Sequence, residues 1–204
     1  LVLVVDQSGG AELRAAVESL ATAVPIEVVA QPRLGLAASR NLALERLGGE
    51  IFAVTDDDCV PDREWVAAVT RAFAADPGLA AVTGPVLPLP ATADRTEPVS
   101  SRSRAEPGVF SGRVAPWHVG TGGNMALNPA KLGGLRFDER LGAGSPGLAG
   151  EDIALIDGLL AAGARIRYEP EAVVCHERQS RARRRAARYG YGHGVGAMIG
   201  LGLR

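Results

Sequence analysis

The chain has 204 residues, 47% hydrophobic and 22% charged, which suits one domain with a full core and excludes a disordered or collagen-like chain. No run of 18 apolar residues is present, so we expect no membrane-spanning helix. Two cysteines are too few to hold a fold together by disulfides, and they indicate a reducing compartment such as the cytoplasm.

Charge is distributed unevenly along the chain. Residues 1–176 carry 15 basic and 22 acidic side chains, whereas residues 177–204 carry 7 basic and 1 acidic. We therefore expect a main domain over residues 1–176 and a basic, glycine-rich C-terminal tail over residues 177–204. Because Leu1 already lies in an apolar run, we also expect that the chain begins inside a longer protein.

The first half of the chain alternates between two hydrophobic patterns. Short apolar runs predict buried strands at residues 1–5, 26–30, 51–54 and 79–83. Helical spacing predicts helices at residues 13–20, 35–47 and 65–73. This alternation predicts an α/β/α three-layer sandwich with a mainly parallel central sheet. Ligands bind such sheets beyond the carboxyl ends of the strands, where Asp6 and residues 56–58 are expected.

The second half of the chain is less regular. Residues 85–116 are rich in proline and lack periodicity, which predicts a long surface loop, with order resuming at Trp117. A helix is predicted over residues 150–162, followed by short strands at residues 165–168 and 172–175.

Three adjacent carboxylates, Asp56, Asp57 and Asp58, follow a predicted buried strand. Such groups repel one another unless a cation neutralises them, and divalent cations commonly bridge paired carboxylates to substrate phosphates. The alternative is a solvated acidic turn that caps the next helix. Both interpretations stay open on this triplet alone.

Six motifs occur in the order found in one enzyme family. They are residues 4–6, 35–41, 49–58, 122–125, 134–139 and 150–152. Through them the chain resembles, over residues 1–176, the family-2 glycosyltransferases with the GT-A fold (a nucleotide-diphospho-sugar transferase fold). The family has one more strand before the Asp6 strand, so the resemblance implies that the first strand of the domain is missing here. It also implies an inverting transfer of a sugar from a nucleotide-sugar donor to an acceptor hydroxyl, aided by Mn²⁺ or Mg²⁺. The implied acceptor is a glycan, a lipid-linked or a small molecule, in bacterial surface glycan or glycolipid synthesis.

The resemblance also implies roles for residues on the donor side. Asp6 would contact the donor base or ribose, and the triplet at residues 56–58 would hold the metal and diphosphate as a D-x-D motif, with Asp56 and Asp58 as metal ligands. His176 ends a predicted strand where some GT-A enzymes place a third metal ligand, although a capping or hydrogen-bonded histidine is an alternative. Arg40 would lie near the donor or on the helix surface.

On the acceptor side, the resemblance makes Asp152 the general base, with Glu151 beside it at the donor. Asp152 falls in the first turn of a predicted helix, whose dipole favours an ionised carboxylate. The alternative is an acidic pair that only complements a helix start. Gly122, Gly123 and Asn124 would let the backbone approach donor and acceptor, unless they form a plain turn.

Other functions stay open on the same residues. A sugar nucleotidyltransferase shares the α/β fold, the metal and the nucleotide, and a non-catalytic fragment or a nucleic-acid-binding module would use the arginine-rich tail. No nucleic acid is expected, because the acidic body repels phosphate. The tail combines arginines with Tyr189, Tyr191 and apolar residues, which predicts either peripheral contact with the cytoplasmic face of an anionic membrane or a helix packed on the acidic body.

Overall fold

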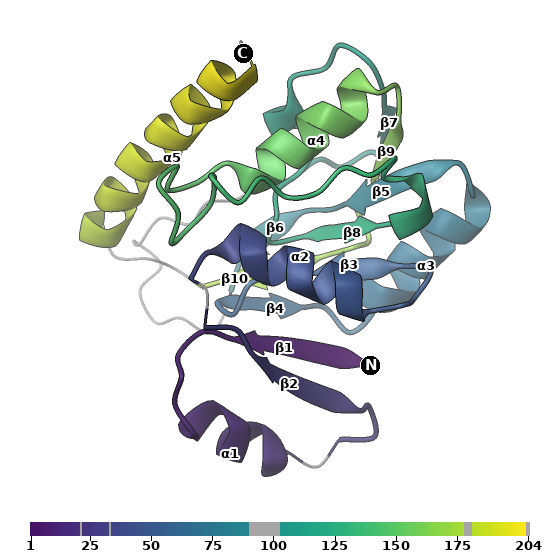
Figure 1. The fold of residues 1–204 in the computed structure, drawn as a ribbon. Helices are drawn as coiled ribbons and strands as arrows, with labels where there is room; N and C mark the ends of the chain where they lie inside the picture. The colour runs from purple at the N-terminus through teal and green to yellow at the C-terminus, as the bar shows by residue number, and fades with distance from the viewer. Residues whose placement is uncertain (21, 33, 90–102, 178–180, 203–204) are drawn as a thin grey trace.

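The computed structural model describes residues 1–20, 22–32, 34–89, 103–177 and 181–202 (Figure 1). The helices are α1 (Glu12–Glu18), α2 (Leu36–Arg46), α3 (Trp65–Ala75), α4 (Glu151–Ala161) and α5 (Arg181–Gly202), with 3-10 turns η1 (Pro116–His118) and η2 (Pro129–Lys131). The strands are β1 (Val2–Asp6), β2 (Ile26–Ala30), β3 (Phe52–Val54), β4 (Cys59–Pro61), β5 (Leu79–Thr83), β6 (Val86–Pro88), β7 (Gly108–Phe110), β8 (Met125–Leu127), β9 (Arg165–Tyr168) and β10 (Val174–His176).

The central sheet has five strands in the order β3-β8-β5-β9-β7. Strands β3, β5 and β9 run in one direction, and β8 and β7 run against them. All five residues of β5 are buried, as expected for a strand covered on both faces. The predicted α/β fold is confirmed, and its central sheet is mixed, with three of the five strands sharing one direction.

Helices cover both faces of this sheet (Figure 1). Side chains of α2 and α4 share one hydrophobic core with Met125 and Leu127 of β8, whereas α3 shares the other core with Ala126. Successive side chains of a strand point to opposite faces, so β8 contributes to both cores. The result is the three-layer arrangement predicted from the alternation of elements.

A second sheet, in the order β4-β10-β6, brings distant segments together at the edge of the molecule. Strand β10 pairs antiparallel with β4, with Cys59 opposite His176, and parallel with β6. Residues 85–116 were predicted to be a surface loop, but the structure places β6 and β7 within that range, and order resumes before Trp117. Strands of three residues are too short to show a period, which explains the error. Residues 90–102 lie outside the described residues.

Strands β1 and β2 form a separate parallel pair covered by α1 (Figure 1). Leu3 and Val5 of β1 pack against the core that contains α2 and α4. The amide of Gln7 donates to the carbonyl of Gly35 at 3.1 Å, which connects the end of β1 to the start of α2. Asp6 therefore lies at the carboxyl end of its strand, as predicted.

The tail forms a helix, α5, that packs on the loop before α4. A Cβ at Gly194 would meet the carbonyl of Ala149, so the helix and this loop are in direct contact. The imidazole of His193 also lies 3.1 Å from the carbonyl oxygen of Pro146. Among the described residues, no helix is long and apolar enough to cross a membrane.

Candidate active site

The acidic triplet forms the turn between β3 and β4. The amide of Cys59 donates to the carbonyl of Asp56 at 3.1 Å, and Cys59 begins β4. Asp57 is exposed, and Asp56 and Asp58 are partly buried. The alternative in which the triplet caps a helix is wrong, because a strand follows it.

Arg40 connects the acidic turn to α4. Its guanidinium donates to Asp56 Oδ1 and to Glu151 Oε1, both at 2.7 Å, and its side chain is only 5% exposed. The alternative that Arg40 lies on the helix surface is therefore wrong. The predicted contact between Arg40 and the donor stays a prediction.

Glu151 is the buried partner of this arginine. Burial and the neighbouring Asp152 carboxylate raise the pKa of Glu151, and Arg40 opposes that shift. A Cβ at Gly142 would lie 2.8 Å from Glu151 Oε2, so glycine makes room for the carboxylate. The side chain predicted to bind the donor is thus packed inside the protein against Arg40.

Asp152 lies in the first turn of α4, as predicted, and its carboxylate is held by backbone amides. Gly122 donates to Oδ2 at 2.6 Å and Ile153 donates to Oδ1 at 2.8 Å. Each carboxylate oxygen has a second lone pair that can accept a hydrogen bond from a hydroxyl group. The loop before β8 thus orients the carboxylate that the sequence singled out as the base.

The glycines of that loop lie against the buried arginine and the acidic turn. A Cβ at Gly122 would lie 2.5 Å from Arg40 Nη1, and one at Gly123 would lie 3.1 Å from Asp56 Oδ2. Glycine is required at Gly122 because a side chain there would displace the guanidinium. The backbone of this loop thus packs closely against Arg40 and Asp56, and its approach to donor and acceptor stays a prediction.

Asn124 is 1% exposed and organises the protein interior. Its amide nitrogen donates to the carbonyls of Pro85 and Ala172 at 2.9 and 2.7 Å, and its oxygen accepts from the Trp65 indole at 2.9 Å. This side chain, predicted to line the donor site, fixes three segments of the protein to one another. Its contact with a ligand stays a prediction.

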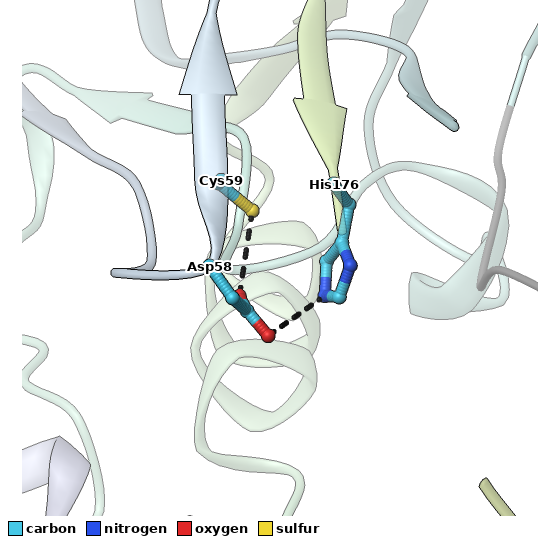
Figure 2. A group of neighbouring side chains, drawn as sticks. All are labelled: Asp58, Cys59 and His176. Atoms are coloured by element: carbon cyan, nitrogen blue, oxygen red, sulfur yellow. Dashed lines mark hydrogen bonds and ion pairs between the residues drawn. The ribbon is translucent and has the colours of Figure 1, made fainter. Parts of the chain in front are cut away.

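His176 and Asp58 face each other at the start of the second sheet (Figure 2). His176 Nε2 lies 3.3 Å from Asp58 Oδ2, and Nδ1 lies 2.6 Å from the carbonyl oxygen of Glu177. A carbonyl only accepts hydrogen bonds, so Nδ1 carries a proton, and a histidine bonded in this way can either donate from Nε2 to Asp58 or bind a metal ion through Nε2. Such an Nδ1 bond to a carbonyl is typical of metal-bound histidines. The chain thus has the donor set for the expected metal.

Asp6, expected at the donor base or ribose, is held by its own turn. Its Oδ1 accepts from the backbone amide and the hydroxyl of Ser8, at 2.8 and 2.7 Å. These hydrogen bonds lower the pKa of the Asp6 carboxyl, because they favour its ionised form. The carboxylate is therefore fixed in orientation at the end of β1.

Two further residues of the site carried little signal in the sequence. Cys59 packs partly buried against the core that contains α3, and its sulfur also lies 3.8 Å from Asp58 Oδ1. Asn41 exchanges two hydrogen bonds with the backbone of Phe137, donating at 2.9 Å and accepting at 3.0 Å. Asn41 thereby connects two of the six motifs, at residues 35–41 and 134–139. In the sequence, the presence of both motifs was the only feature that pointed to this contact.

Comparison with known proteins finds relatives of this chain by sequence. The chain is 32% identical over 185 residues to the succinoglycan biosynthesis protein ExoM of Rhizobium meliloti, covering 86% of this chain and 56% of ExoM. It is 29% identical to the pre-mycofactocin glycosyltransferase of Mycobacterium tuberculosis, covering 86% of this chain and 37% of that protein. The chain therefore spans about half, or less, of the length of these relatives.

Solved structures show the same fold at low sequence identity. S. aureus TarS in complex with UDP-GlcNAc superposes with a TM-score of 0.64 at 17% identity, over 88% of this chain and 50% of that one. The mannosyltransferase PcManGT of Pyrobaculum calidifontis, in complex with GDP-Man and Mn²⁺, gives 0.57 at 22% identity, over 86% and 47%. GalNAc-T7 with UDP, GalNAc and Mn²⁺ gives 0.59 at 15% identity, over 88% and 38%.

These matches agree with a family model that covers the part of the chain from β1 to beyond the acidic turn. The model described as "Glycosyl transferase family 2" matches residues 1–106, which include Asp6, Arg40 and the whole triplet at residues 56–58. With its GT-A fold and its six ordered motifs, the chain belongs to glycosyl transferase family 2.

Proposed function

We propose that the chain is a metal-dependent inverting glycosyltransferase acting on a nucleotide-diphosphate sugar. The observation that carries this proposal is the bridge made by Arg40, which bonds Asp56 of the acidic turn and Glu151 at the start of α4. It brings the carboxylates proposed for the donor phosphates close to Asp152, the proposed base. The name of ExoM and the GT-A structures solved with nucleotide sugars support a role in bacterial surface glycan or glycolipid synthesis.

The metal, Mn²⁺ or Mg²⁺, would be held by Asp58 and His176, with Asp56 beside them. Asp56 Oδ1 is bonded to Arg40, so Oδ2 is its remaining oxygen for a cation or a donor hydroxyl. A divalent cation at this place neutralises charge that develops on a diphosphate leaving group. The Mn²⁺ in the GalNAc-T7 and PcManGT structures supports this choice of cofactor.

Asp152 would accept the proton of the acceptor hydroxyl as that oxygen attacks the anomeric carbon of the donor. The bond from the anomeric carbon to the diphosphate breaks in the same displacement, which inverts the configuration. The amide bonds from Gly122 and Ile153 hold the carboxylate in one orientation for this step. General-base catalysis of this kind contributes roughly 10²–10⁴-fold to the rate.

Titration calorimetry with UDP and GDP tests the metal assignment directly. We expect nucleotide binding in MnCl₂ that is lost in chelator and in the Asp58→Ala variant. Glu64→Ala is the control, because Glu64 lies at the start of α3 and is exposed. Nucleotide affinity that is the same with chelator and with Mn²⁺ would refute the metal dependence.

A donor panel read out by nucleoside diphosphate release tests the reaction. Asp152→Asn is expected to lower turnover by roughly 10²–10⁴-fold with little change in donor affinity. Asp157→Asn is the control, because Asp157 lies on the same helix and is exposed. Release of pyrophosphate instead of a nucleoside diphosphate would indicate a sugar nucleotidyltransferase.

We further propose that α5 attaches the enzyme to the cytoplasmic face of an anionic membrane. Gly190, Gly194 and Leu201 share the face of α5 that meets the loop before α4 or the groove beside it. The opposite face carries Arg185 and Tyr189, with Ile199 about three turns further on, and all three are exposed. Basic, aromatic and apolar side chains on one helix face favour an anionic lipid surface.

Co-sedimentation of the chain with vesicles tests this attachment. We expect pelleting on phosphatidylserine vesicles at low salt, and little pelleting on neutral phosphatidylcholine vesicles. Tyr189→Ser with Ile199→Ser should reduce pelleting, whereas Val66→Ser, an exposed apolar residue of α3, should not. Equal pelleting of all three proteins would refute the membrane role of α5.

A further inference from the structure

One cluster of side chains combines three different metal-ligating atoms. A carboxylate oxygen of Asp58, the sulfur of Cys59 and a ring nitrogen of His176 all lie within 4.8 Å of one another (Figure 2). The family resemblance accounts for the aspartate and the histidine as ligands of Mn²⁺ or Mg²⁺. It gives no role to the thiol, which hard oxygen-seeking cations do not require.

The strand pairing explains why the thiol faces this site. Cys59 and His176 are directly opposite each other on the antiparallel strands β4 and β10, so their side chains project from the same face. The amide of Glu177 also donates to the carbonyl of Asp58 at 2.9 Å, which extends the pairing by one step. The other cysteine, Cys175, is opposite Val60 and projects from the other face. The three donor atoms are therefore held by paired backbone before any ion binds.

The distances suit a tetrahedral zinc ion. Asp58 Oδ2 lies 3.3 Å from His176 Nε2, and Asp58 Oδ1 lies 3.8 Å from Cys59 Sγ. Tetrahedral Zn²⁺, with bonds of about 2.0 Å to oxygen and nitrogen and about 2.3 Å to sulfur, separates its ligand atoms by about 3.3–3.6 Å. One ligand atom from each residue lies within 4.8 Å of the other two, so side-chain rotation has to shorten the longest separation by at most about 1.3 Å to reach tetrahedral geometry.

We propose that Asp58, Cys59 and His176 form a three-ligand site for a thiophilic divalent cation such as Zn²⁺ or Cd²⁺, which competes there with Mn²⁺ and Mg²⁺. On binding, the S–H bond of Cys59 breaks, its proton goes to solvent, and the thiolate bonds the metal. The competition rests on the proposed function, because it assumes that Asp58 and His176 also hold the hard cation. Zinc at this place blocks the cation that the transfer needs, so Zn²⁺ is an inhibitor of the enzyme.

Cadmium reports on the thiol directly, since a thiolate bound to Cd²⁺ has an ultraviolet charge-transfer band. CdCl₂ added to the full chain is expected to produce this band in the wild-type protein and in Cys175→Ser, and not in Cys59→Ser. Circular dichroism shows whether each variant is folded, and serine is a conservative replacement for both cysteines. Persistence of the band in Cys59→Ser, or its loss in Cys175→Ser, would overturn the proposal.

Zinc affinity and competition complete the test. ZnCl₂ titrations against a fluorescent zinc chelator should show that Cys59→Ser weakens binding by more than about tenfold, or about 1.4 kcal/mol. Excess MnCl₂ should lower the apparent zinc affinity of the wild-type protein. Equal zinc affinity in wild type and Cys59→Ser would overturn the three-ligand site. Zinc binding that requires Cys59 but ignores Mn²⁺ would overturn only the shared metal centre, and with it the metal assignment of the proposed function.

Discussion

Replacing Arg40 by methionine removes the charge that connects the acidic turn to α4, while keeping a side chain of similar length. Arg40 is 5% exposed, and its partner Glu151 is 6% exposed, so the variant leaves a buried carboxylate without its counter-charge. Removing one partner of a buried ion pair costs about 3–5 kcal/mol. The loss of the pair with Asp56 adds little to this cost, because Asp56 is 32% exposed and solvent screens its charge. We expect a loss of about 3–5 kcal/mol in the free energy of unfolding.

Urea unfolding followed by circular dichroism measures this loss. Arg46→Met is the matched control, because Arg46 lies on the same helix and its pair with Glu27, at 3.5 Å, is about half exposed. The free energy of unfolding of Arg46→Met should lie within about 1 kcal/mol of the wild-type value. Adding Glu151→Gln to Arg40→Met removes the unpaired charge, and we expect it to restore at least half of the lost stability.

The loss should also depend on pH in a defined direction. Burial already raises the pKa of Glu151, and replacing Arg40 removes the nearby charge that most strongly opposes that shift. The folded variant then binds a proton that the unfolded chain has released, so its stability falls as pH rises above the unfolded pKa of the carboxyl. The cost of Arg40→Met is therefore smaller at about pH 5 than at about pH 8. If Arg40→Met lost no more stability than Arg46→Met, or if its loss of stability grew as pH falls, this reasoning would be refuted.

Three further substitutions test the packing around the site and α5. Asn124→Ala removes three buried hydrogen bonds, each contributing about 1 kcal/mol, and should cost about 2–3 kcal/mol in urea unfolding; a cost below about 1 kcal/mol would contradict its structural role. Gly122→Ala places a Cβ 2.5 Å from Arg40 Nη1 and should cost about 1–3 kcal/mol in the same assay. Gly194→Ala should speed amide hydrogen exchange in α5, because its Cβ meets the loop before α4. Gly196→Ala faces open space and should slow that exchange, since alanine favours the helix by about 1 kcal/mol; equal effects would mean that α5 does not pack there.

Much of the fold was predictable because its signals are local. The apolar runs at residues 51–54 and 79–83 and the helical spacing at residues 35–47 each lie within one element, and their alternation predicted the layers. The positions of Asp6 and the acidic triplet at strand ends followed from the same runs. The strands at residues 86–88 and 108–110 were missed, because three residues contain no period.

The site divides in the same way between sequence and tertiary structure. The sequence by itself singled out the candidate site residues, since the order of six motifs pointed to residues 56–58 and Asp152. Only the tertiary structure decided that Arg40 is buried between Asp56 and Glu151. Glu151 lies 111 positions further along the chain than Arg40. It also decided that Cys59 faces His176, through the pairing of β4 with β10. Such contacts depend on how helices and strands pack across the whole core, and hydrophobic periodicity describes only the face that each element buries.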